Sequence, residues 1–342
     1  MHTKWLFIII VVLSFAGCKK GNATVVDPPI ADTGFFAKGA DIGWLSEMEA
    51  AGIQFYHPNG TATECIQLLK SFGINSIRLR VWVDPSNGWC GTEDVVKQAK
   101  RAVNAGMKIM IDFHYSDFWA DPGKQNKPKA WQNFTTNELN DAVYTHTKNV
   151  MLTLKANGVN PKWVQIGNET NDGMLWEEGR ASKNMIQFAS MLKAGIKAVK
   201  EVSNTSKTII HLSNGYDNPM FRWMFDGLTS NGVEWDVIAM SLYPTKDNWI
   251  QLNNQCLVNM QDMISRYGKE IMISEVGMEV AESMACKQFL TDIISKTKSL
   301  TNHKGLGVFY WEPQSYNKWK GYTLGAFDQN GKPTIAMEAF MQ

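Results

Sequence analysis

The sequence predicts an α/β fold, a single (β/α)8 barrel of the TIM type. Short apolar runs alternate with amphipathic segments from Gly34 onward, and eight such pairs fit into roughly 300 residues. No low-complexity linker interrupts this alternation. An open doubly wound sheet is the alternative, but Gly39 and Gly43, beside the first run, lack the spacing of a dinucleotide-binding turn. The closed barrel is therefore the predicted architecture.

The apolar runs and the periodic segments between them define the predicted elements. Strands are expected at 36–41, 75–82, 107–113, 162–167, 207–212, 236–241, 271–275 and 305–311. Helices are expected at 61–72, 92–105, 136–157, 182–200, 217–230, 248–267 and 283–300, with a last one at 333–341.

Local signals mark where several of these helices begin and end. Thr61, three residues before Glu64, has the form of a capping box, and Thr136 precedes Glu138 at the start of a long apolar periodicity. Three glycines each follow a helix and precede a strand, where a left-handed residue is favoured: Gly73, Gly106 and Gly158.

The N-terminal residues resemble an export signal. Lys4 precedes an apolar stretch at 5–15 that is too short for a stop-transfer span. The sequence Phe-Ala-Gly-Cys at 15–18 is similar to a bacterial lipobox, although Phe15 replaces the usual Leu. We predict a lipoprotein signal peptide at 1–17, lipidation of Cys18, a tether at 18–33 and a catalytic barrel at 34–342. The protein is then exported and anchored to a bacterial membrane, with the outer membrane favoured and its face left open; an ordinary secretory signal is the alternative.

Without Cys18, four cysteines remain, an even number that suits an oxidising compartment. Pairing of sequence neighbours is the expected connectivity, Cys65 with Cys90 and Cys256 with Cys286. Four buried free thiols are the alternative.

The bulk composition restricts the class of ligand. A formal net charge of +1 gives no support for a nucleic-acid partner. Thirteen Trp, nine Tyr and sixteen Phe are enough to fill a core and also to stack on flat sugar faces. We expect a monomer that binds a neutral molecule and meets the membrane only through its lipid anchor.

Two glutamates each end a predicted strand, Glu169 the fourth and Glu275 the seventh. Strands of a parallel barrel all end at one face, and these two lie on opposite sides of it, so the carboxyl groups can face each other. Hydrolysis of a glycosidic bond requires such a pair, one to protonate the leaving oxygen and one on the other side of the sugar. A distance of about 5–5.5 Å between the two carboxyl groups would indicate retention of configuration, and a distance of about 6.5–9.5 Å would indicate inversion. The alternative is that each Glu only pairs with a nearby cation.

Further candidates surround this pair at the same face. Asn168 precedes Glu169 and can bind a sugar 2-hydroxyl. Arg78 and Arg80 share one face of the second strand, and we predict that Arg80 pairs with the nucleophilic carboxylate. A bridge from an Arg to Asp41 or Asp112 is the alternative. Three more candidates end predicted strands, namely His114, Tyr115 and Tyr243. Three tryptophans are expected to help exclude water from the site: Trp163, Trp176 and Trp311.

A metal site would have to combine His114 with Asp112, Asp117 and Asp121. The chain lacks His-Glu-x-x-His or a comparable ligand spacing. We predict no metal and no required cofactor, and structural calcium held by loop carboxylates is left open.

Taken together, several segments resemble glycoside hydrolase family 53, the endo-β-1,4-galactanases. The matching segments are 38–41, 78–82, 112–122, 165–169, 274–275 and 307–313. They extend from the first strand to the eighth, and the segment from His114 to Pro122 is the most specific. Gly-Asn-Glu at 167–169 occurs in many retaining barrel glycosidases.

The resemblance implies retaining, endo-acting hydrolysis of β-1,4-galactan and type I arabinogalactan, with Glu169 as acid/base and Glu275 as nucleophile. It also implies the residues that line the sugar site: Arg80, His114, Asn168, Tyr243 and Trp311, to which the matched segments add Asp41, Trp82, Tyr115 and Trp119. The loop after the eighth strand looks shorter than in relatives that carry calcium there. A barrel hydrolase acting on xylan, mannan or cellulose, or a glycan-binding lipoprotein without activity, remains as an alternative.

Overall fold

The computed structural model describes Met1, His2 and residues 34–342. Cys18, the tether and the predicted signal peptide beyond its first two residues lie outside the described residues. The unit from Phe35 to Gln342 is compact. None of the helices in the described part of the chain is both long and apolar enough to cross a membrane.

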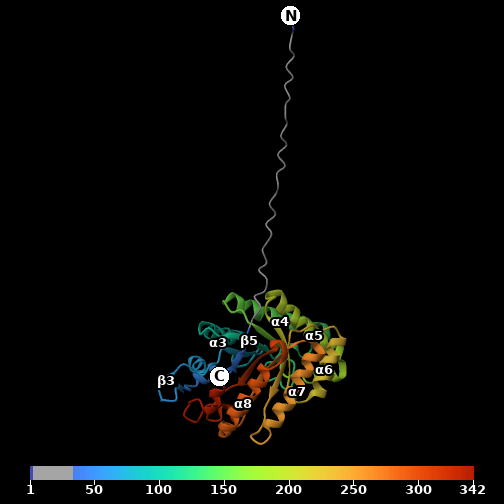
Figure 1. The fold of residues 1–342 in the computed structure, drawn as a ribbon. Helices are drawn as coiled ribbons and strands as arrows, with labels where there is room; N and C mark the ends of the chain where they lie inside the picture. The colour runs from blue at the N-terminus through green and yellow to red at the C-terminus, as the bar shows by residue number, and fades with distance from the viewer. Residues whose placement is uncertain (3–33) are drawn as a thin grey trace. The chain divides into compact units, whose positions relative to one another are not determined.

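Eight parallel strands close into a barrel, which confirms the predicted fold (Figure 1). Each strand pairs with the next in the chain, and the last returns to the first. The strands are β1 (Ala37–Asp41), β4 (Ser76–Val81), β5 (Lys108–Phe113), β6 (Trp163–Ile166), β7 (Lys207–Leu212), β8 (Val237–Leu242), β9 (Glu270–Val276) and β10 (Gly305–Trp311). All eight begin and end within one residue of the predicted bounds, because buried parallel strands appear in sequence as continuous apolar runs.

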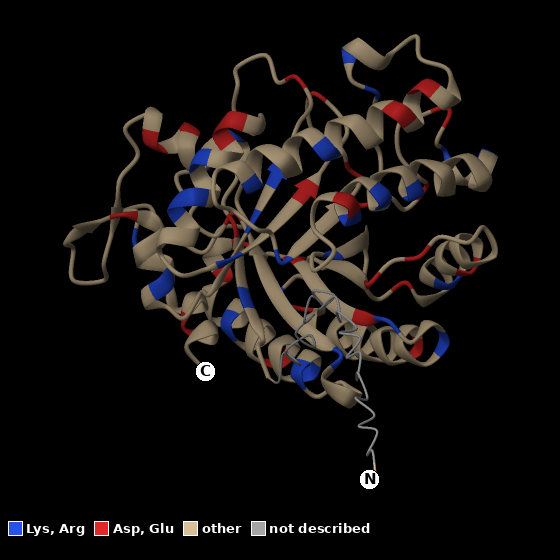
Figure 2. Cartoon of the chain, turned by 90° about the horizontal axis from the view of Figure 1, so that it is seen from above, with Lys and Arg blue, Asp and Glu red and all other residues tan. Residues whose placement is uncertain are grey.

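Helices surround the barrel and cover its outer face (Figures 1 and 2). They are α2 (Cys65–Ser71), α3 (Thr92–Asn104), α4 (Thr136–Ala156), α5 (Ala181–Val202), α6 (Asn218–Ser230), α7 (Trp249–Tyr267) and α8 (Ser283–Lys298). The predicted last helix is instead a 3-10 helix, η5 (Ile335–Met341). A short helix and a small hairpin were not predicted, namely α1 (Leu45–Ala50) and the pair β2 (Phe55–Tyr56) with β3 (Ala62–Thr63).

The hairpin explains why the predicted capping box at Thr61 is wrong. Ala62 and Thr63 are extended and pair with Tyr56 and Phe55. The helix therefore starts later, and the side chain of Glu64 is its N-cap, accepting from the backbone N–H of Gln67.

The remaining boundary signals agree closely with the structure. Helix α4 starts with a reciprocal capping box between Thr135 and Glu138, one residue before the expected Thr136. Gly73, Gly106 and Gly158 have φ angles of +89°, +81° and +76°, as predicted for glycines that end helices.

The barrel interior is apolar at one end and charged at the other. A cluster that includes Met110, Trp163, Met272 and Phe309 fills the end where the strands begin. The prediction that Trp163 shields the mouth is therefore wrong, because this residue starts β6 instead of ending it. Figure 2 shows charged residues of both signs on the strands inside the ring of helices.

The four cysteines of the barrel are free and buried, so neither predicted disulfide is present. Cys90 Sγ lies 3.6 Å from the carbonyl oxygen of Gly43, and Cys286 Sγ lies 3.7 Å from the hydroxyl of Tyr310. Cys256 sits on α7, where its sulfur faces Gly215, and Cys65 is the buried first residue of α2. The free-thiol alternative describes the structure because the cysteines pack as small apolar residues.

Candidate active site

Glu169 and Glu275 line one cavity at the face where the strands end. The cavity has a volume of about 340 Å³. Its lining consists of His114, Trp119, Ala120, Asp121, Asn168, Glu169, Tyr243, Glu275, Trp311, Tyr322 and Leu324. Two carboxyl groups from different strands thus share a single concave site, as the sequence predicted.

A tight turn after β6 positions Glu169. Gly167 has a φ of +83°, and a Cβ there would lie 2.6 Å from a methyl carbon of Thr170. Glu169 itself has a φ of +44°, which is uncommon for a residue with a side chain. The turn is tied to β7, because the N–H of Thr170 donates to the carbonyl oxygen of His211 at 3.0 Å. Such backbone strain is typical of functional positions.

Arg78, not the predicted Arg80, pairs with Glu275. Its Nη1 lies 2.8 Å from Glu275 Oε1, and the hydroxyl of Tyr243 donates to Oε2 at 2.9 Å. Glu275 is only 5% exposed, so both contacts act in a poorly solvated environment.

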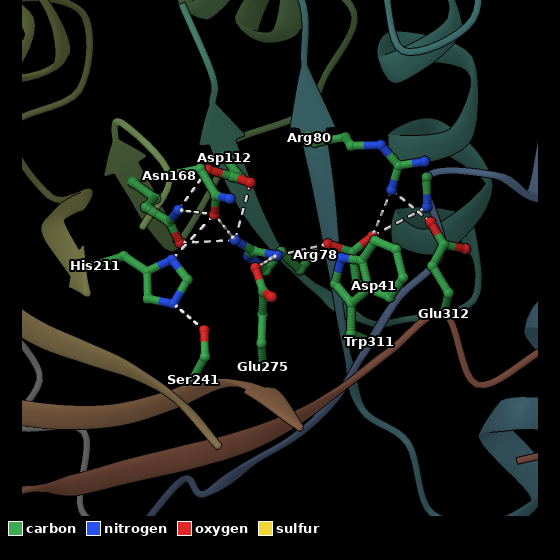
Figure 3. Close-up of polar contacts among 12 residues, drawn as sticks. Asp41, Arg78, Arg80, Asp112, Asn168, His211, Ser241, Glu275, Trp311 and Glu312 are labelled. Carbon is green, nitrogen blue, oxygen red and sulfur yellow. Dashed lines mark hydrogen bonds and ion pairs between the residues drawn. The ribbon is translucent and has the colours of Figure 1, made fainter. Parts of the chain in front are cut away.

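The same guanidinium joins the strands beneath the cavity (Figure 3). Arg78 pairs with Asp41 at 2.7 Å and Asp112 at 2.9 Å, and it donates to Asn168 Oδ1 at 2.9 Å. The alternative of a bridge to Asp41 or Asp112 is thus true of Arg78, in addition to its contact with Glu275. Burial opposes ionisation of Asp112, but the Arg78 charge and the contacts with His114 and His211 together outweigh it and leave the pKa of this carboxyl below its usual value.

Arg80 serves a second ion pair beside the cavity. It contacts Glu312 at 2.5 Å and Asp41 at 3.3 Å, and its guanidinium lies 4.4 Å from the centre of the Trp119 ring. Arg80 is two residues nearer the mouth than Arg78, so it meets Glu312, which follows β10. Sequence alternation gives the face of a strand to which a side chain points, but not which carboxylate it reaches.

Glu169 lies in a different environment. Its Oε1 is 2.7 Å from Ser241 Oγ, so its direct partner is a neutral hydroxyl. Burial raises the pKa of Glu169, and Asp121 and Asp112 raise it further. The Arg78 charge lowers it, as does a hydrogen bond whenever the Ser241 hydroxyl donates to the ionised carboxylate. Burial also raises the pKa of Glu275, Arg78 lowers it, and the Glu169 carboxylate raises it again.

The two carboxyl groups consequently disfavour each other's ionisation. We assign the first negative charge to Glu275, because it has the direct ion pair with Arg78 and a phenol donor. Glu169 then keeps the proton. One ionised and one protonated carboxyl group is the state required to begin a double displacement at a sugar carbon.

Aromatic rings form one wall of the cavity. The ring centres of Trp119 and Trp311 are 5.7 Å apart, and those of Trp311 and Tyr322 are 4.8 Å apart. Flat apolar faces of this kind suit the C–H faces of a sugar ring.

Hydrogen bonds set the orientation of His114, whose ring centre lies 6.1 Å from that of Trp119. His114 Nδ1 accepts from the indole N–H of Trp82 at 3.3 Å and from the backbone N–H of Ala120 at 3.1 Å. Nε2 must then carry the hydrogen, which it donates to Asp112 Oδ2 at 3.0 Å.

Five of the predicted sugar-binding residues line the cavity: His114, Trp119, Asn168, Tyr243 and Trp311. The other four do not line it: Asp41, Arg80 and Trp82 support the lining from behind, and Tyr115 lies outside it. Asp41 and Arg80 form buried ion pairs, with Arg78 and Glu312 respectively. Trp82 packs behind His114 and Trp119.

Tyr115 follows His114 and points the other way, toward the surrounding helices. Its hydroxyl is 2.7 Å from Thr147 Oγ1 on α4, and its ring stacks on Phe113. Trp176, expected to exclude water, is likewise not in the cavity lining and lies under the guanidinium of Arg180 at 3.9 Å.

Several residues of the site had no predicted role: Tyr322 lines the cavity, while His211, Ser241 and Glu312 lie behind it. Asp121, considered only as a metal ligand, also lines the cavity, and Arg78 lies behind it. A sequence signal for Ser241 was present, because it lies two residues before Tyr243, which follows β8, and side chains two residues apart in an extended chain point to the same face.

The residues considered for a metal site have separate tasks. Asp112 pairs with Arg78, and Asp117 accepts from the backbone N–H groups of Asp84 and Lys129. Within residues 34–342, no group of three or more His, Cys, Asp and Glu side chains is placed to hold a metal ion. Independence of a cofactor stays a prediction.

The chain is similar to known proteins along almost its whole described length. The family model for glycosyl hydrolase family 53 matches residues 37–340. An Aspergillus niger protein named arabinogalactan endo-β-1,4-galactanase A is 32% identical over 84% of this chain and 87% of its own length. The Bacillus subtilis endo-β-1,4-galactanase is 31% identical over 81% of this chain and 70% of its own length.

Solved structures give the same result. The family 53 catalytic domain from Ignisphaera aggregans has a TM-score of 0.82 at 32% identity, covering 89% of this chain and 95% of that one. A structure from a study of two fungal β-1,4-galactanases has a TM-score of 0.83 at 28% identity, covering 89% of this chain and 98% of that one. A xylanase from Thermotoga maritima, 17% identical with a TM-score of 0.60, shares the fold alone.

Proposed function

The chain belongs to glycosyl hydrolase family 53, and from this premise we propose that it is an endo-acting β-1,4-galactanase. Its substrates are galactan and type I arabinogalactan, and it hydrolyses them with retention of anomeric configuration. The observation that carries this function is the placement of Glu169 and Glu275 in one cavity with unlike partners, a hydroxyl for the first and a guanidinium for the second.

In the first step, Glu275 acts as the nucleophile. Its ionised carboxylate attacks the anomeric carbon while Glu169 gives its proton to the glycosidic oxygen, so the leaving chain departs as an alcohol. Arg78 and the Tyr243 hydroxyl hold the attacking carboxylate in place. A galactosyl ester on Glu275 results.

In the second step, Glu169 acts as a base. Its carboxylate takes a proton from water, the water oxygen attacks the anomeric carbon, and Glu275 leaves as a carboxylate. Two inversions give net retention. One N–H of the Asn168 amide donates to Ala120 at 2.8 Å, and the second is free to bind the sugar 2-hydroxyl in both steps.

A comparison of polysaccharides tests the substrate. We expect the purified protein to release galacto-oligosaccharides from β-1,4-galactan, because the relatives to which it is similar over most of its length are galactanases. Reducing ends are measured in parallel on galactan, xylan and mannan. Release from xylan or mannan without release from galactan would contradict the substrate, and galactan binding without turnover would indicate a binding protein.

We further propose that the protein is exported and anchored through lipid on Cys18, with 1–17 as the signal peptide and 18–33 as the tether. The support is Lys4, the apolar stretch at 5–15 and the similarity of 15–18 to a lipobox. Mass spectrometry of the mature N-terminal peptide tests this. We expect a diacylated Cys18 at its start, whereas a mature chain that starts at another residue without lipid contradicts the proposal. The monomeric state stays a prediction.

A further inference from the structure

Three side chains, one from the turn after β6 and one each from β7 and β8, form a hydrogen-bonded chain that ends at Glu169. Asn168 Oδ1 lies 3.0 Å from His211 Nδ1, and His211 Nε2 lies 2.8 Å from Ser241 Oγ. Ser241 Oγ lies 2.7 Å from Glu169 Oε1. Figure 3 shows Asn168, His211 and Ser241 in line. His211 is fully buried, and the two reaction steps above make no use of it.

The orientation of the Asn168 amide is fixed by its other partners. Its Nδ2 donates to the carbonyl oxygen of Ala120 at 2.8 Å. Its Oδ1 accepts from Arg78 Nη2 at 2.9 Å and from Gln165 Nε2 at 3.0 Å. A flipped amide would place N–H groups against the Arg78 donor and a carbonyl against Ala120. Only an acceptor therefore faces His211.

This acceptor determines which ring nitrogen of His211 carries the hydrogen. Nδ1 must donate to Asn168, so Nε2 is bare and accepts from the Ser241 hydroxyl. The other tautomer would gain the backbone N–H of Glu169 as a donor, but that contact is 3.4 Å, longer than an ordinary hydrogen bond. Burial lowers the pKa of His211 well below its usual range, and Arg78 lowers it further, so the ring is neutral.

The single hydrogen of Ser241 is thereby committed to His211. Ser241 Oγ can then only accept from Glu169, which requires a hydrogen on the carboxyl group. We propose that the Asn168–His211–Ser241 chain keeps Glu169 protonated in the resting enzyme, which makes His211 and Ser241 positioning residues for the acid step. The role as acid rests on the proposed function.

When Glu169 is ionised, the Asn168–His211–Ser241 chain of side chains loses one hydrogen bond. When Glu169 has given its proton to the leaving oxygen, the Ser241 hydroxyl rotates and donates to the new carboxylate. His211 Nε2 then loses its donor, or the ring changes tautomer and its bare Nδ1 faces Asn168 Oδ1. The bond is regained when Glu169 takes a proton from water, so the same chain favours the base step. The Ser241 hydrogen rotates and is not transferred.

Other charged groups also face Glu169, and each comes from a different element. They are Arg78 from β4, Asp112 from β5, Asp121 from the loop after β5, and Glu275 from β9. Tyr243, which follows β8, and His114, which follows β5, are further ionisable groups near Glu169 and His211. A variant that leaves all of these groups in place isolates the effect of the Asn168–His211–Ser241 hydrogen bonds on the Glu169 pKa.

His211→Phe is such a variant, since it removes both ring nitrogens and keeps a planar ring. The Ser241 hydroxyl becomes free to donate to the Glu169 carboxylate, so the pKa of Glu169 falls. We expect a decrease of about one unit, the size of one hydrogen bond gained by the charged form. Activity needs the proton on Glu169 and is lost as pH rises through this pKa, so the alkaline limb of kcat/KM moves to lower pH by the same amount.

The direct measurement is the titration of the Glu169 carboxyl carbon by ¹³C NMR in the unliganded protein, assigned by comparison with Glu169→Gln. It needs no substrate, so it can fail independently of the galactan assay that tests the proposed function. An unchanged or raised Glu169 pKa in His211→Phe would overturn the inference. His211→Leu carries the same expectation if Phe does not fit the site.

Two further variants distinguish the loss of the His211 hydrogen bonds from a general effect of altered packing on the Glu169 pKa. His146→Phe changes another buried imidazole, which packs on Phe113 and Trp131 away from the cavity, and it should leave the Glu169 titration unchanged. In a Ser241→Ala background, adding His211→Phe should cause no further shift, because the link to Glu169 is already broken. A full additional shift there would overturn the inference.

Discussion

Glu275→Gln lowers kcat on galactan by roughly 10⁴-fold or more, beyond the range of general acid–base catalysis alone. The amide keeps the size of the carboxyl group but cannot form the galactosyl ester. It also leaves the Arg78 guanidinium without the anion at 2.8 Å. Reducing-end release from β-1,4-galactan measures the effect.

Glu234→Gln is the matched control for this substitution. Glu234 has a side chain that is 90% exposed and pairs loosely with Lys269 at 3.5 Å, so its replacement should leave kcat unchanged. Circular dichroism and thermal unfolding show whether the Glu275 variant is folded. A folded Glu275→Gln protein with normal turnover would remove Glu275 from the mechanism.

Glu169→Ala is expected to lower kcat on galactan by about 10²–10⁴-fold, the usual contribution of a general acid. The loss should be much smaller for the first step with a dinitrophenyl β-galactoside, because that leaving group departs without a proton. The galactosyl ester then accumulates, since no base activates water. A burst of dinitrophenolate followed by slow turnover is the measurable sign.

Added azide gives a second test of the Glu169→Ala variant. It is a nucleophile that needs no base, and the alanine leaves space for it, so it should restore turnover and give β-galactosyl azide. Proton NMR identifies the anomer. An α-galactosyl azide, or equal losses for activated and natural leaving groups, would contradict the role of Glu169 as acid/base.

The barrel was predictable because its strands are buried on both faces. Continuous apolar runs such as the one at 237–240 have few alternative structures in an alternating α/β chain. Helix α1 and the small hairpin were missed because two to six residues carry little periodicity. Their structure depends on tertiary contacts, as in the pairing of Tyr56 with Ala62.

The catalytic pair was predictable for a similar reason, since the end of a strand fixes where a side chain lies. The partners of the pair were harder to predict. Arg78 and Arg80 point to the same face of β4. Their different depths in the barrel decide that Arg78 pairs with Glu275 and Arg80 with Glu312. The sequence therefore indicated the correct strand and the wrong arginine.

His211 was missed because it interrupts an apolar run and looks like a core histidine. It is indeed fully buried. Its relevance depends on contacts with Asn168, from the turn after β6, and with Ser241 on β8, and no pattern within β7 contains that information. A buried polar residue within a strand of a predicted barrel is thus worth testing for partners on both neighbouring strands.

The most direct test of the central claim, that Glu169 and Glu275 form a retaining pair with Glu275 as nucleophile, is to trap the intermediate. A 2-deoxy-2-fluoro-β-galactoside with an activated leaving group slows both steps, so the ester persists, and peptide mass spectrometry locates the sugar. The account predicts one fluorogalactosyl group per chain, attached to Glu275. A label on any other residue, or an enzyme that turns over galactan with inversion and never forms the ester, would contradict it.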